Sequence, residues 1–167
     1  MAGHTARPRL HRRAVLCGGT LLAAGAVAGG WVVGERALAA RPNGAGAPSA
    51  LTPPEALDAI RAGTLVLVDV RHPDEWAETG IAEGAVPIDM RRHDFVEAVT
   101  AARGGREVAI GVICARGVRS RRMAQRLAAA GIDGIVDVPE GMLGSRAGPG
   151  WLARDLPVVH DLPVVRP

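Results

Sequence analysis

The chain has 167 residues, the size of one ordinary domain, and its apolar fraction of 48% is enough for a buried core. The formal charge of +3 is unevenly distributed: residues 1–39 carry five arginines and one acidic residue, whereas residues 40–167 carry fifteen arginines and sixteen acidic residues. A nearly neutral body with 2% aromatic residues lacks the basic surface and the stacking side chains of nucleic-acid-binding proteins. We therefore expect no nucleic-acid partner.

Residues 1–39 have the pattern of an export signal. Arginines at positions 7, 9, 12 and 13 precede an uncharged run, residues 14–34, and Ala-Leu-Ala at 37–39 fits a signal-peptidase site. The adjacent Arg12 and Arg13 resemble a twin-arginine (Tat) signal, with His11 and Cys17 as departures from it. Because the run is rich in glycine, cleavage before Ala40 is favoured over retention as a membrane anchor. We expect a periplasmic or otherwise exported protein, which contacts the membrane only if the leader is retained.

Beyond a Pro/Gly/Ala-rich linker at residues 40–51, helix and strand patterns alternate. Helices are predicted at 52–63, 72–80, 94–105 and 120–131, most of them from proline or acidic residues near the start and glycine at the end. Apolar, β-branched runs predict buried strands at 64–70, 107–113 and 134–138, and a short strand is expected at 85–89. This alternation predicts an α/β domain over residues 52–159, with a parallel sheet between helices, followed by a tail at 160–167.

The carboxyl ends of parallel strands share one edge of the sheet, and ligands bind there. In this chain the edge would gather Arg71, the Arg-Arg-His run at 91–93, Cys114 and a loop at 139–150 that contains Arg146. We therefore expect a cysteine surrounded by arginines at this edge.

The segment CARGVRS, residues 114–120, places Cys114 between a buried strand and a helix expected to begin at Ser120. Backbone N–H groups of such a loop can point inward and bind an anion, and Gly117 allows the loop to turn tightly. The charges of Arg116 and Arg119 favour the thiolate form of Cys114 and an anionic co-reactant. The pattern predicts a nucleophilic cysteine; the alternative is a small buried hydrophobe among solvated arginines.

Four segments resemble, in order, the successive blocks of one rhodanese (sulfurtransferase) family domain: LVDVRHPDEW (67–76), GIAEGAVPID (80–89), VICARGVRS (112–120) and EGM…GWLARDLPV (140–158). The resemblance implies a single three-layer α/β/α domain with a mainly parallel central sheet. It also implies a sulfurtransferase without a cofactor. Such an enzyme moves sulfane sulfur from an anionic donor such as thiosulfate, through a cysteine persulfide, to a thiol, a cyanide-like acceptor or a protein.

Carried onto this sequence, the resemblance assigns the persulfide to Cys114. The donor would contact the loop residues Ala115, Arg116, Gly117, Val118 and Arg119. Asp69 and Arg71 match the family's Asp-x-Arg pair and, together with Ser120, are expected to support the site. Two departures bear on the substrate: TGIAEGA lacks the histidine of the family's Gly-His-Ile-Pro-Gly-Ala, and the loop at 141–150 is longer than usual.

Other kinds of cysteine site fit the spacing less well. Cysteine-dependent phosphatases have five residues between cysteine and arginine, whereas four separate Cys114 from Arg119, and Ser120 stands where the phosphatase arginine would be. We disfavour an arsenate reductase together with the cysteine-dependent phosphatases. No metal is expected, because one cysteine remains after the leader and the histidines lack ligand spacing. A sulfur carrier or rhodanese-like binding module without turnover stays open as a second function.

Overall fold

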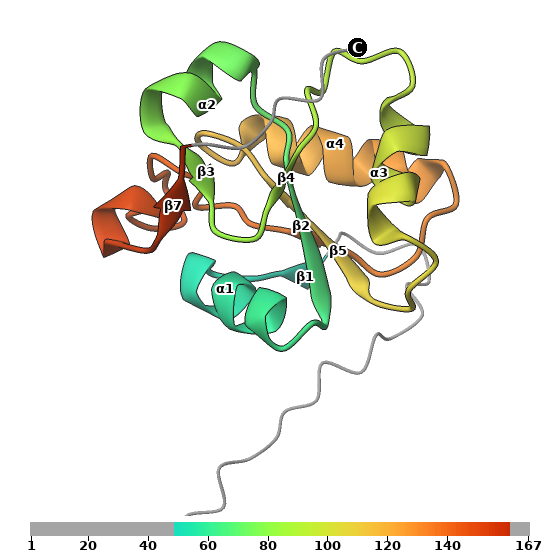
Figure 1. The fold of residues 1–167 in the computed structure, drawn as a ribbon, viewed down its shortest axis with the longest axis horizontal. Helices are drawn as coiled ribbons and strands as arrows, with labels where there is room; N and C mark the ends of the chain where they lie inside the picture. The colour runs from blue at the N-terminus through green and yellow to red at the C-terminus, as the bar shows by residue number, and fades with distance from the viewer. Residues whose placement is uncertain (1–48, 161–167) are drawn as a thin grey trace, which may run out of the picture. The chain divides into compact units, whose positions relative to one another are not determined.

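The computed structural model describes residues 49–160 (Figure 1). The predicted export signal at 1–39, most of the predicted linker and nearly all of the predicted tail lie outside these residues. None of the helices within residues 49–160 has the length and apolar character needed to cross a membrane.

Five parallel strands form the central sheet, in the order β1-β6-β5-β2-β4. The strands are β1 (Ser49–Ala50), β2 (Leu65–Asp69), β4 (Val86–Pro87), β5 (Ala109–Ile113) and β6 (Ile135–Asp137). β2 and β5 pair along five residues each and lie at the centre of the domain. A separate antiparallel pair joins β3 (Ile81–Ala82) to β7 (Val158–Val159).

Helices cover both faces of this sheet (Figure 1). They are α1 (Pro53–Arg61), α2 (Pro73–Thr79), α3 (Phe95–Arg103) and α4 (Val118–Ala129), with a 3₁₀ helix at Leu152–Arg154. Successive β2 side chains point to opposite faces, so Leu67 packs in a core with α1, and Val68 packs in a second core with α3 and α4. The predicted three-layer α/β/α architecture with a parallel central sheet is therefore confirmed.

Local sequence explains where α1 begins. Pro53 occupies its first turn, where a missing N–H costs nothing. The Glu55 carboxylate reaches back to accept hydrogen bonds from the Thr52 N–H at 2.8 Å and from its hydroxyl at 2.7 Å. These contacts satisfy polar groups at the start of the helix, as the sequence predicts.

Two predicted boundaries are wrong. Ser49, Ala50 and Leu51 were expected in the linker, but β1 pairs with β6, and Leu51 is buried and donates its N–H to the Asp137 carbonyl at 3.0 Å. Helix α4 begins at Val118 and not at Ser120. Gly117, with a φ of +80°, ends the cysteine loop abruptly enough for the helix to start two residues earlier.

Candidate functional site

Cys114 is the first residue after β5, at the carboxyl end of a central strand. Its side chain is 1% exposed, and its Sγ accepts a hydrogen bond from the Gly117 N–H at 3.2 Å. Helix α4 starts at Val118, directly after Gly117, so its N-terminal dipole is directed toward the sulfur. The Gly117 N–H and the helix dipole thus stabilise negative charge on or beside this sulfur.

A second loop, residues 139–144, packs directly under the cysteine loop. The Met142 N–H donates to the Cys114 carbonyl at 2.8 Å, and the Leu143 N–H donates to the Ala115 carbonyl at 2.9 Å. A Cβ on Gly117 would lie 2.1 Å from the Pro139 carbonyl oxygen. The two loops therefore fix each other's backbone, which holds the Gly117 N–H on the sulfur.

Ser120 and Asp137 lie in the interior behind this loop. The buried Ser120 hydroxyl donates to the Gly117 carbonyl at 3.1 Å, which fixes the turn from inside the first turn of α4. Burial raises the pKa of Asp137, whose Oδ1 has no hydrogen-bond partner among residues 49–160. Sequence reasoning placed Asp137 in a strand and gave it no role; a lone acid in an otherwise apolar strand was the available signal.

The two arginines of the loop have different environments. Arg116 is exposed, and its Nη1 donates to the Gly144 carbonyl at 3.3 Å. Arg119 instead forms a two-pronged ion pair with Glu75 of α2, at 2.6 and 2.5 Å. The Arg119 guanidinium is the main cause that lowers the pKa of Glu75 to about 2, so Glu75 is ionised at neutral pH. The sequence pattern does not indicate this role of Glu75, which stands there only as an acid in the first turn of a predicted helix.

Asp69 and Arg71 form a fully buried pair. Arg71 donates to both carboxylate oxygens of Asp69, and its remaining N–H groups reach Thr79 and the Gly80 carbonyl. The pair therefore joins the end of β2 to the C-terminal end of α2. Arg71 is buried and does not line an open edge of the sheet, and the supporting role of the pair stays a prediction.

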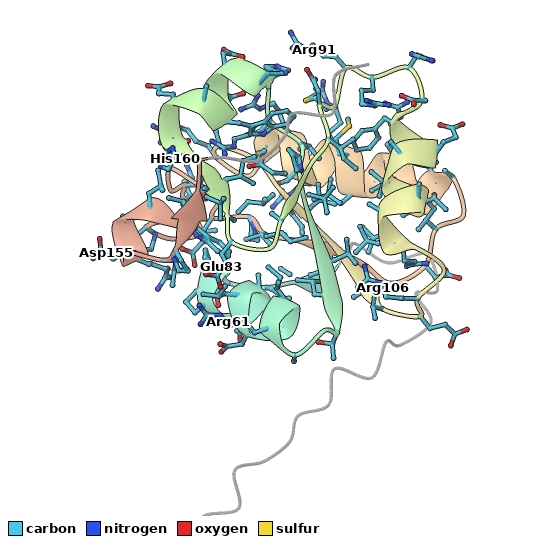
Figure 2. All side chains as sticks on the ribbon, viewed as in Figure 1. Arg61, Glu83, Arg91, Arg106, Asp155 and His160 are labelled. Carbon is cyan, nitrogen blue, oxygen red and sulfur yellow. The ribbon has the colours of Figure 1, made fainter. Side chains whose placement is uncertain are left out.

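Several of the arginines expected around Cys114 are paired with carboxylates. Arg91, which projects at the surface, pairs with Asp89 at 2.6 Å (Figure 2), and Arg92 pairs with Asp94 at 2.7 Å. Arg146 is exposed in the loop beyond Gly144. Cys114 is thus flanked by the two arginines of its own loop, of which Arg119 is already neutralised.

Other features of the described domain lie away from Cys114. A groove of about 920 Å³ is lined by α2, β4 and α3, and no residue of the cysteine loop borders it. Within residues 49–160, no three His, Cys, Asp or Glu side chains are grouped so that they could hold a metal ion. The chemistry that the described residues support is that of a single buried sulfur.

Residues 52–146 match the sequence model of the rhodanese-like domain family. Among solved structures, a thiosulfate sulfurtransferase from Pseudomonas aeruginosa is similar with a TM-score of 0.56 and 21% identity, over 69% of this chain and 21% of that chain. Rv0390 from M. tuberculosis is similar with a TM-score of 0.52 and 26% identity, over 70% of this chain and all (100%) of that one.

A protein of unknown function from Rhodopseudomonas palustris, called a possible tyrosine phosphatase, has a TM-score of 0.53 and 20% identity, over 67% of this chain and 85% of that chain. At 20% and 21% identity, the likeness to the Rhodopseudomonas protein and to the Pseudomonas enzyme shows the fold alone. The comparison with curated proteins found no match. Since the family match covers more than half of the chain, including β2, α2 and the cysteine loop, the chain belongs to the rhodanese-like domain family.

Proposed function

We propose that this protein is a sulfurtransferase that carries sulfane sulfur as a persulfide on Cys114. The observation that carries the proposal is the environment of the Cys114 sulfur, which is shielded from water, accepts the Gly117 N–H and faces the N-terminus of α4. A persulfide is an anion on a sulfur atom, and this site offers it a donor and a helix dipole without room for bulk water. Membership of the family supports the same chemistry.

The reaction consists of two displacements. In the first, the Cys114 thiolate attacks the outer sulfur of a donor such as thiosulfate; the S–S bond of the donor breaks, and sulfite leaves with the bonding electrons. In the second, a nucleophile such as cyanide or a thiolate takes the outer sulfur, and the electrons of the broken S–S bond return to Cys114. Both steps keep one negative charge on the enzyme's sulfur, which the loop N–H groups and α4 stabilise.

The residue after Arg119 argues for sulfur transfer over phosphate transfer. Ser120 stands where cysteine-dependent phosphatases place their arginine, and its buried hydroxyl is already used by the Gly117 carbonyl. No guanidinium is therefore available at that position to bind a phosphoryl group.

The test is thiocyanate formation from thiosulfate and cyanide, with Cys114→Ser as the variant and Cys17→Ser as its matched control. We expect Cys114→Ser to lower the rate by at least about 100-fold, because serine cannot form the persulfide, and Cys17→Ser to leave it unchanged. Wild-type protein that forms no thiocyanate but gains one sulfur atom by intact mass would instead identify a sulfur carrier. Absence of both would contradict sulfur chemistry at Cys114 and leave a binding module.

We propose further that the domain acts outside the cytoplasm, on the basis of the arginine-rich leader with its uncharged run and Ala-Leu-Ala site. Substitution of both Arg12 and Arg13 by lysine keeps the charge but removes the twin-arginine pattern. We expect the variant to remain in the cytoplasm on cell fractionation. Normal export of this variant would exclude the Tat route.

A further inference from the structure

Glu75 and Arg119 join α2 to the cysteine loop. Their side chains are 23% and 29% exposed, and both N–H···O contacts are short, at 2.6 and 2.5 Å. A planar guanidinium facing a carboxylate in this way has little freedom to rotate toward another anion. Arg119 is therefore held chiefly by Glu75, although it lies on the first turn of α4 and is also influenced by Cys114.

Other contacts hold Glu75 in place from its own side. One of its carboxylate oxygens also accepts the His72 N–H at 3.1 Å, at the start of α2. Its backbone carbonyl accepts Nη1 of Arg71 at 3.3 Å, and Arg71 is itself fixed by buried Asp69. Glu75 is thus a rigid partner to which the more exposed Arg119 is tied.

The pairing changes the charge that an approaching anion meets. With Glu75 ionised, the charge of Arg119 is cancelled. Within residues 49–160 Arg116 forms no ion pair, and its one hydrogen bond goes to the neutral Gly144 carbonyl. Apart from the Cys114 sulfur itself, the cysteine loop together with its ion-pair partner therefore carries one uncompensated positive charge.

We propose that Glu75 is a positioning and specificity-determining residue of the Cys114 site: it holds Arg119 against the loop and cancels its charge, so that Arg116 alone attracts an anionic sulfur donor. The substrate class follows from the charge balance and rests on the proposed sulfur transfer. With Arg119 neutralised, the site favours the dianion thiosulfate over a singly charged donor such as 3-mercaptopyruvate less than a loop with two free arginines would. From 3-mercaptopyruvate the Cys114 thiolate takes the sulfur atom as the C–S bond breaks. The electrons of that bond leave with the carbon as the enolate of pyruvate, which takes up the proton of the donor thiol.

The charge at Cys114 can be measured without sulfur transfer. Iodoacetamide and iodoacetate alkylate the same thiolate, but only iodoacetate is an anion, so the ratio of their rates reports the local charge and not the amount of thiolate. Peptide mass spectrometry separates Cys114 from Cys17 in the full chain. We expect Glu75→Gln to raise the iodoacetate-to-iodoacetamide ratio about threefold at low salt, and the increase to vanish near 1 M salt.

Matched variants isolate the ion pair. Glu78→Gln makes the same charge change on the exposed side of α2 and should leave the ratio unchanged. Arg119→Gln should lower it, because Glu75 is then uncompensated, and the double variant Glu75→Gln, Arg119→Gln should return it to within about 1.5-fold of wild type. Glutamine at 75 keeps an oxygen for the His72 N–H, and the Arg119 variant tests the pair even if the Glu75 variant is unstable. Equal ratios for the Glu75 and Glu78 variants, or no return in the double variant, would overturn the proposal.

Donor kinetics then test the substrate class. In Glu75→Gln we expect kcat/KM for thiosulfate to rise relative to that for 3-mercaptopyruvate by about threefold, through KM. An altered alkylation ratio with no turnover of either donor would uphold the charge role of Glu75 and contradict the proposed function. Turnover of both donors with an unchanged preference would contradict the assigned substrate class.

Discussion

Gly117 is the residue at which the cysteine loop, α4 and the loop at 139–144 meet. Its φ of +80° is strained for any residue with a Cβ, and that atom would also overlap the Pro139 carbonyl oxygen. Gly131, just beyond the other end of α4, has an almost equal φ of +81° but open space around it. Comparing substitutions at these two glycines therefore separates the cost of backbone strain from the cost of overlap with Pro139.

We predict that Gly131→Ala lowers the free energy of unfolding by about 1 kcal/mol, the cost of a left-handed alanine. Gly117→Ala should cost about 3 kcal/mol or more, because Pro139 must also move, and it should slow alkylation of Cys114 as the loop N–H leaves the sulfur. Urea unfolding of the two variants measures the difference. Equal losses would mean that the loops do not hold each other as described.

Which site residues the sequence could reveal depended on their distance along the chain. Cys114 follows an apolar strand, and Asp69 and Arg71 are two residues apart at the end of another, so local pattern and resemblance were enough to locate them. Glu75 and Arg119 are separated by 44 positions, and their pairing depends on how α2 packs beside α4. Arg91 and Arg92, by contrast, pair with Asp89 and Asp94, each two positions away, so sequence spacing could have indicated that they are neutralised.

At the scale of the element, the start of α4 shows tertiary structure overriding local preference. Serine is a strong N-cap residue and glycine a weaker one, so the sequence favoured a helix starting at Ser120. In the structure Ser120 lies within the first turn, and its buried hydroxyl bonds back to the Gly117 carbonyl. The early start brings the helix N-terminus two residues closer to Cys114, which matters for the charge it stabilises.

The long loop before Trp151 is organised by a carboxylate that no local pattern identifies. Glu140 is buried and accepts the Gly150 N–H at 3.0 Å and Arg154 at 2.8 Å. Burial raises the pKa of Glu140, but these two donors outweigh it and the net shift is downward. The loop is therefore closed on itself around Glu140, and its first half forms the wall behind the cysteine loop.

At the scale of the whole domain, the alternating pattern predicted β2, β4, β5 and β6 of the parallel sheet, but neither its β1 edge nor the separate β3–β7 pair. Buried strands such as β2 and β5 have long apolar runs, whereas β1, β3 and β7 are two residues each and are defined only by their partners. β7 comes from the first copy of the repeated Asp-Leu-Pro-Val-Val, and its antiparallel pairing with β3 joins residues almost eighty positions apart. Such short strands carry too little sequence pattern to be recognised alone.

The family match and the sequence analysis both start the domain at residue 52, but the sheet starts at Ser49. A chain that begins at Ser49 should therefore be more stable than one that begins at Thr52, by about 2 kcal/mol, the value of burying one leucine side chain. Both chains keep Thr52 and the cap of α1, so the difference comes from β1 and from Leu51, which is 9% exposed. Urea unfolding of the two chains measures it, and equal midpoints and slopes would place β1 outside the cooperative unit of the fold.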